Sequence, residues 1–193
     1  MAHLTQQQGP LGPFYDGAMP VSGYFSEPGQ AMTAGTGITT GVGTVYLAFV
    51  EEVGPVIKTT IFIDLTGLAS STAGDIIGKD GGTANCHFGR VTTAVNGLIF
   101  RGQISCAETP ATGEPDIDVW SATEATGAED AAVSGLTETA IQDAAADYTK
   151  GVTKAFTGNV VADQYLYLAS SGGGDAAVYT AGQFVIEMWG WKV

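Results

Sequence analysis

The chain has 193 residues, of which 45% are hydrophobic, so it can bury the core of one domain of ordinary to large size. Only 14% of the residues are charged and 28 are glycine, a composition that favours short strands joined by tight turns over a disordered chain. The formal net charge is −13, and no two of the seven Lys and Arg residues are adjacent, which excludes nucleic-acid binding and argues against binding to anionic lipid.

Residues 1–41 are punctuated by Gly and Pro too often for a long helix or a central strand, so they predict an extended N-terminal arm. The arm carries two aromatic pairs, Phe14-Tyr15 and Tyr24-Phe25, which we expect to act as anchors. Terminal segments become ordered when they are tied down, here either on their own domain or on a neighbouring subunit. The first ten residues lack the basic and apolar parts of a secretory signal, which predicts synthesis in a cytoplasm.

Residues 42–193 are predicted to form one β-sandwich domain. The run 45–50 is almost continuously apolar, although 42–50 is too short to span a bilayer, and 56–65 alternates as a strand with one buried face does. Further strands are expected at 75–78, 84–92, 98–106, 117–121, 164–169 and 184–193.

One short helix is predicted near residues 139–149. Thr139 followed by Gln142 resembles a capping box, and Lys150-Gly151 supplies a basic end and a stop signal. The apolar stripe of this helix consists of Ile141, Ala145 and Tyr148. About eight strands without βαβ alternation predict an all-β fold, an antiparallel sandwich that is jelly-roll-like, with the N-terminal arm and this single helix added.

Cys86 and Cys106 lie ten residues on either side of Asn96, and Asn96-Gly97 is a strong hairpin signal. Pairing about that turn would bring the two cysteines opposite each other, so a cross-strand disulfide is one reading. The other reading is two reduced thiols, as expected in a cytosolic protein. Cys86-His87 is a poor metal pair because adjacent strand residues point to opposite faces.

Glu114, Asp116 and Asp118 share one side of a predicted strand. A solvated face of a half-exposed edge strand is the simplest reading of this pattern. Calcium binding and glycoside hydrolysis by paired carboxylates are the alternatives. His3 and His87 lack any surrounding catalytic signature, and there is no nucleophile elbow or phosphate loop. We therefore predict no enzymatic activity and no catalytic, cofactor or metal site.

Aromatic residues are concentrated near the C-terminus. Trp189 and Trp191 share one face of the last predicted strand, opposite Phe184, Ile186 and Met188. An exposed tryptophan pair there would indicate a subunit contact. Alternatively, the tryptophans and tyrosines could stack on sugars as a lectin-like platform.

The tail of the chain resembles the closing hairpin of small β-barrel proteins on phage particles, over less than a fifth of its length. The segments that carry the resemblance are Tyr165-Leu-Tyr-Leu-Ala, Gly172-Gly-Gly-Asp and Tyr179-Thr-Ala-Gly-Gln-Phe-Val-Ile-Glu-Met-Trp-Gly190. In particular, the tail looks like the head decoration (cement) proteins and related virion proteins of marine podoviruses. The resemblance implies trimers or similar clusters seated on the major capsid lattice, with the arm reaching a neighbouring subunit. It transfers no functional residues, because these proteins have no catalytic motif.

We therefore expect a structural virion protein, made in the host cytoplasm, that decorates a capsid. Its expected partners are the major capsid protein and further copies of itself, with a homotrimer favoured, and its expected contact residues are Phe14, Tyr15, Tyr24, Phe25, Trp189 and Trp191. A carbohydrate-recognition module of a tail or fibre is the alternative. A jelly-roll major coat protein is a third possibility, disfavoured by the absence of a basic segment.

Overall fold

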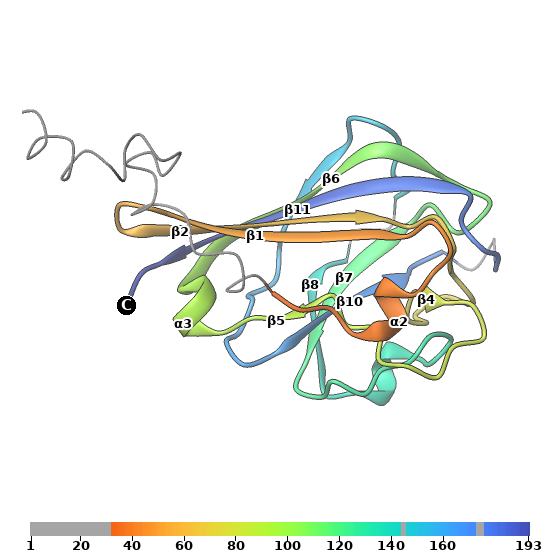
Figure 1. The fold of residues 1–193 in the computed structure, drawn as a ribbon, viewed down its shortest axis with the longest axis horizontal. Helices are drawn as coiled ribbons and strands as arrows, with labels where there is room; N and C mark the ends of the chain where they lie inside the picture. The colour runs from red at the N-terminus through yellow and green to blue at the C-terminus, as the bar shows by residue number, and fades with distance from the viewer. Residues whose placement is uncertain (1–31, 144–145, 173–175) are drawn as a thin grey trace, which may run out of the picture.

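The computed structural model describes residues 32–143, 146–172 and 176–193, which fold into two packed layers of antiparallel strands (Figure 1). The elements in chain order are α2 (Thr36–Thr39), β1 (Val45–Val53), β2 (Val56–Asp64), β3 (Leu68–Ala69), β4 (Gly78–Lys79), β5 (Gly89–Arg90), α3 (Thr93–Asn96), β6 (Leu98–Ala111), β7 (Ile117–Ala122), a 3-10 turn (Val133–Gly135), β8 (Glu138–Gln142), β9 (Thr153–Ala155), β10 (Tyr165–Ser170) and β11 (Ala181–Trp191).

One layer is a five-stranded sheet in the order β1-β2-β11-β6-β9, and the other is a four-stranded sheet in the order β5-β10-β7-β8. The short strands β3 and β4 form a small ribbon of their own. Apart from β1 and this ribbon, the strands pair as nested antiparallel partners: β2 with β11, β5 with β10, β6 with β9 and β7 with β8. That nesting is the topology of a jelly roll, so the predicted all-β, jelly-roll-like sandwich is confirmed.

The five-stranded sheet follows the predicted alternation closely. Along β2 every second side chain is buried, from Ile57 to Ile63, and along β11 the buried positions include Phe184, Ile186 and Met188. Period-2 burial arises when one face of a sheet packs on a core and the other does not. The inner face of this sheet therefore builds one side of the hydrophobic core.

The two inner strands of the four-stranded sheet, β7 and β10, are buried on both faces. Tyr167 on β10 directs its hydroxyl to the backbone carbonyl of Glu124 (2.8 Å) and receives the Gly127 N–H (3.3 Å), so this face lies under the loop joining β7 to β8. Leu166 and Leu168 occupy the opposite face of the strand and are also fully buried. The strands β7 and β10 are consequently buried along nearly their whole length, including the polar residues Asp118 and Ser121 of β7.

The prediction of a helix near residues 139–149 is wrong. Residues 138–142 form β8, where Thr139 pairs with Ser121 and Ala140 with Trp120. Ile141 and Tyr148 do reach the core, but from a strand and from the loop after it. Pairing with β7 overrides the helical pattern, while Ala145 lies outside the described residues.

The hairpin predicted at Asn96-Gly97 is also wrong. Asn96 ends the short helix α3, and Gly97 follows it with φ 71° and ψ −168°, so the positive φ that glycine allows is used to leave a helix rather than to form a hairpin turn. Buried Asn96 donates its amide to the Thr59 hydroxyl (2.9 Å). The two flanking segments join different sheets, and Cys86 and Cys106 are both buried free thiols.

Within the predicted arm, residues 32–41 are described. Met32 and Ile38 are buried in the core, and the short helix α2 packs near β1 and β4. Tyr46 of β1 fixes the start of this segment, because its hydroxyl lies 3.1 Å from the carbonyl oxygen of Met32.

Candidate functional site

The outer face of the five-stranded sheet is the most distinctive surface of the domain, and no described element lies over it (Figure 1). Antiparallel register aligns its side chains in rows across β1, β2, β11 and β6. Two rows are largely apolar, namely Leu47–Phe62–Val185–Ser105 and Val53–Val56–Trp191–Leu98. A further row combines charged side chains with one aromatic ring and consists of Glu51, Lys58, Trp189 and Arg101.

Trp189 is held between two cations. Lys58 and Arg101 are its cross-strand neighbours on β2 and β6, with the Lys58 Nζ 5.7 Å and the Arg101 guanidinium carbon 5.0 Å from the indole centroid. Lys58 also pairs with Glu187 at 2.7 Å. This pairing holds the pKa of Glu187 below its usual value. Cation–π contacts and the ion pair fix Trp189 in place as a half-buried part of the sheet.

Trp191 lies at the exposed end of β11 and is 49% accessible. Its ring stacks on Phe100 with the ring centroids 4.6 Å apart, and Phe100 is itself 48% accessible. The register of β6 against β11 shifts between Arg101 and Ile99, which leaves Phe100 in a bulge. A bulge turns a side chain away from strict alternation, so Phe100 and Arg101 are both exposed.

We call the apolar group at this end of the sheet the tip cluster, consisting of Val53, Val56, Leu98, Phe100 and Trp191. It surrounds the β1–β2 turn, to which the chain end is tied by the bond from the Lys192 N–H to the Pro55 carbonyl (2.9 Å). In Figure 1 this end of the sheet projects beyond the four-stranded layer. Four of its members are exposed large apolar side chains, the kind of patch that marks an interaction site.

Strand β1 forms one edge of the five-stranded sheet. Leu47 and Phe49 on its outward side are 48% and 52% accessible, and the charged residues of the strand, Glu51 and Glu52, stand near its end. Exposed apolar side chains of this size make the outward side of β1 a candidate contact surface.

Trp189 and Trp191 therefore share the outward face, as predicted, but only Trp191 offers a free aromatic surface. Sequence reasoning missed Phe100, because a bulge has no signal in simple alternation. The run 45–50 did indicate Leu47 and Phe49, because it is apolar on both of its faces. An edge strand with that pattern carries apolar side chains on its outward face as well as on its core face. The predicted anchors Phe14, Tyr15, Tyr24 and Phe25 lie outside the described residues.

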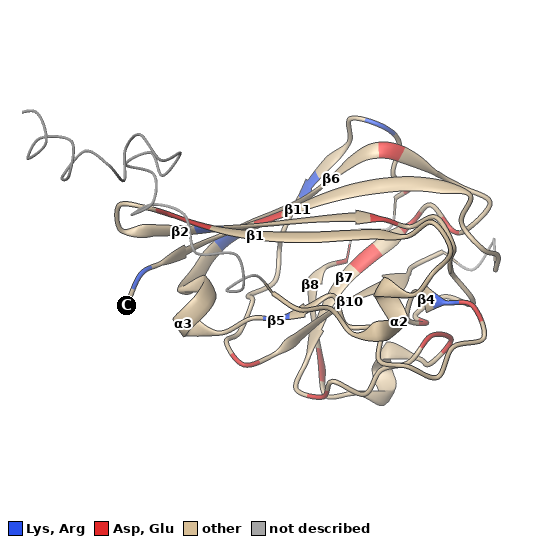
Figure 2. Cartoon of the chain, in the orientation of Figure 1, with Lys and Arg blue, Asp and Glu red and all other residues tan. Residues whose placement is uncertain are grey.

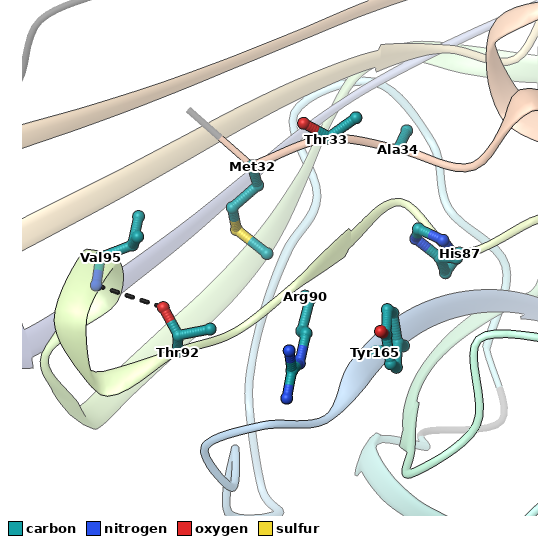
Figure 3. Close-up of a pocket in the computed structure, with 8 residues that line it drawn as sticks. All are labelled: Met32, Thr33, Ala34, His87, Arg90, Thr92, Val95 and Tyr165. Atoms are coloured by element: carbon teal, nitrogen blue, oxygen red, sulfur yellow. Dashed lines mark hydrogen bonds between the residues drawn. The ribbon is translucent and has the colours of Figure 1, made fainter. Parts of the chain in front are cut away.

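A pocket of about 410 Å³ lies where the described chain begins (Figure 3). Met32, His87, Arg90, Thr92, Val95 and Tyr165 are among the residues that line it. The Arg90 guanidinium lies 5.6 Å from the Tyr165 ring centroid and also pairs with exposed Asp163 at 3.1 Å. Figure 3 shows Thr92 and Val95 on one side of the pocket and His87 and Tyr165 on the other.

His87 contributes a polar atom that needs a partner. Its ring lies 4.8 Å from the Tyr165 ring, centroid to centroid, and its Nδ1 is buried without a hydrogen-bond partner among the described residues. Burial lowers the pKa of His87, which favours the neutral imidazole at neutral pH. A neutral ring nitrogen can accept a hydrogen bond from a hydroxyl group.

The acidic cluster is buried, so the predicted solvated edge is wrong. Glu114 and Asp116 precede β7, which is an inner strand between β10 and β8, and Asp118 lies on it with 4% of its surface exposed. Burial raises the pKa of Asp118 to about 6. Lys154 lies 3.8 Å from the carboxylate of Asp116 and partly compensates its burial.

Within the described ranges, no group of three or more His, Cys, Asp and Glu residues could hold a metal ion, so the calcium alternative gains no support there. Figure 2 shows the basic residues spread over several elements, and Lys58 and Arg101 flank Trp189 in one row of the five-stranded sheet. Burial raises the pKa of Cys86 to about 11, which keeps its thiol protonated and unreactive.

Comparison of the chain with protein-family models, with curated proteins and with solved structures finds no match in any of the three. Among the described helices, none is long and apolar enough to cross a membrane.

Proposed function

We propose that this chain is a non-enzymatic structural protein of a tailed-phage particle, and more specifically a decoration protein that binds and stabilises the major capsid lattice. The observation that carries the proposal is the outer face of the five-stranded sheet with its tip cluster, over which no described element lies. A jelly roll is a frequent architecture of virion proteins and of lectins. Apolar rows on the exposed face of an otherwise acidic domain favour binding to protein rather than to nucleic acid.

In this proposal the tip cluster joins copies of the chain into a homotrimer within the virion. Nine residues of extended strand span about 30 Å, and four strands span about 19 Å, giving the outer face roughly 600 Å². A stable interface buries about 800 Å² on each partner. The outer face supplies most of such an area, and the exposed apolar side chains of β1 and the N-terminal arm supply the contacts to the capsid lattice.

The test separates these two contacts. Replacing Phe14, Tyr15, Tyr24 and Phe25 by Ser should abolish co-sedimentation with empty, undecorated phage capsids and leave the oligomer intact. Replacing Phe100 and Trp191 by Ser should instead break the oligomer, whereas the matched control Val161→Ser, an exposed apolar residue on a loop, should do neither. Unchanged occupancy on capsids after the arm replacement contradicts the decoration role.

A carbohydrate-recognition module of a tail or fibre is the second candidate. The stacked pair Phe100 and Trp191 favours it, because flat exposed aromatic rings also bind sugar faces. This candidate predicts a change of tryptophan fluorescence on a glycan panel that is lost in Trp191→Ser. A jelly-roll major coat protein fits less well, because the seven Lys and Arg residues form no basic surface for a packaged genome.

A further inference from the structure

The pocket at Met32 has the features of a built binding site. Its volume of about 410 Å³ falls in the range of roughly 300–1,000 Å³ that ligand sites occupy. Its walls combine a thioether, a guanidinium and an aromatic ring, from Met32, Arg90 and Tyr165. These groups favour an aromatic occupant, since sulfur and cations both make attractive contacts with aromatic rings.

His87 adds a further aromatic wall to the pocket, because its ring lies 4.8 Å from the Tyr165 ring, centroid to centroid. Its Nδ1 is closed off from solvent, so it lies out of reach of a group in the pocket and does not select the occupant. The preferred occupant is therefore an aromatic side chain.

We propose that Tyr24 and Phe25 of the same chain occupy this pocket. The described chain begins at Met32, whose side chain lines the pocket and whose carbonyl is held by Tyr46 at 3.1 Å. Phe25 lies seven residues before Met32, a tether that reaches at most about 25 Å. A tether of that length holds its aromatic groups at millimolar effective concentration near the pocket.

Tether length also distinguishes the two aromatic pairs of the arm. Tyr15 lies 17 residues before Met32, and the effective concentration falls with roughly the 3/2 power of tether length. Tyr24-Phe25 thus has an advantage of about fourfold over Phe14-Tyr15 for this pocket. Docking of the nearer pair leaves the farther pair for a partner, and the inference holds whether or not the chain decorates a capsid.

The experiment is methyl NMR of the full chain labelled with ¹³C at the methionine methyl groups. The chain has four methionines, of which Met32 lines the pocket and Met188 is buried in the core. We expect nuclear Overhauser contacts between the Met32 methyl and aromatic ring protons, with an upfield ring-current shift. The double replacement Tyr24→Ser with Phe25→Ser should remove both effects, and the matched control Phe14→Ser with Tyr15→Ser should keep them.

The Met188 methyl reports that the core of each variant is intact. A Met32 signal that is identical in the wild type and in the Tyr24→Ser, Phe25→Ser variant overturns the proposal. A sample that mixes methionine-labelled chains with aromatic-labelled chains separates contacts within a chain from contacts between chains. Contacts seen only between chains also overturn it, because the occupant is then a neighbouring copy.

Discussion

The two sheets of this domain both carry apolar side chains on two faces, but they differ in how many of those faces are buried. The four-stranded sheet is covered on both faces, by the other sheet and by loops, and Tyr167 and Leu168 are fully buried although they point in opposite directions. The part of the chain that the structure describes covers the five-stranded sheet on one face only, so Ile186 is buried while Leu47 and Trp191 are exposed. Apolar side chains stabilise the fold in the first sheet, whereas on the outer face of the second they are available to a partner.

The largest effect should come from a matched pair of leucines. Leu168→Ala in the doubly covered sheet removes fully buried methyl groups and leaves a cavity, at a cost of about 4 kcal/mol in the free energy of unfolding. Leu47→Ala on the outer face should cost less than about 1 kcal/mol. Urea unfolding followed by circular dichroism measures both, and equal costs would mean that the outer face is packed like a core.

The next largest effect on the free energy of unfolding should come from the buried carboxyl of Asp118, and it should depend on pH. Its pKa is raised from 3.8 to about 6, chiefly by burial, so the native state binds this proton more tightly than the unfolded state does. The stabilisation is present below about pH 4 and is lost as the pH rises through 6, by about 2–3 kcal/mol.

Asp118→Asn should flatten this pH dependence and stabilise the domain at pH 7. The same carboxyl-to-amide change in Glu138→Gln, on the adjacent strand β8, serves as the control and should keep the wild-type slope. Midpoints of urea unfolding measured between pH 4 and pH 7 give this pH dependence for the wild type and for both variants. A wild-type slope in Asp118→Asn would show that another group causes the pH dependence.

A smaller effect tests how firmly the loop covers the four-stranded sheet. Tyr167→Phe removes a hydroxyl that bonds to Glu124 and Gly127, and leaving those groups without a partner should cost about 1–2 kcal/mol. Tyr165→Phe is the matched control on the same face, because among the described residues its hydroxyl has no hydrogen-bond partner; it should cost less than about 0.5 kcal/mol. Hydrogen exchange of residues 123–137 should quicken in Tyr167→Phe alone.

The strands of the fold could be predicted because period-2 alternation is a local signal. The alternation of 56–65 and of 184–193 is directly visible in the sequence, and burial in β2 and β11 follows it. The helix near 139–149 and the turn at Asn96-Gly97 were mispredicted because distant strands decide those regions. Burial of Asp118 was equally hidden, since nothing near it in the sequence places β7 in the middle of a sheet.

The candidate site was predictable only in part. Trp191 could be identified from its face on the last strand, but its stacking partner Phe100 depends on a bulge created by pairing between β6 and β11. The pocket beside Met32 joins residues from three distant parts of the chain, exemplified by Met32, Arg90 and Tyr165. Such a site has no signature in a single sequence, because its members become neighbours only through the jelly-roll topology.

The most direct test of the outer face as a subunit contact is the absolute mass of the purified chain, measured by size exclusion with light scattering. The wild type should be a stable trimer, and the double replacement Phe100→Ser with Trp191→Ser should be a folded monomer. A wild-type monomer that stays a monomer at high concentration, or a double variant that keeps the trimer mass, would contradict the assignment of the tip cluster as the contact between copies.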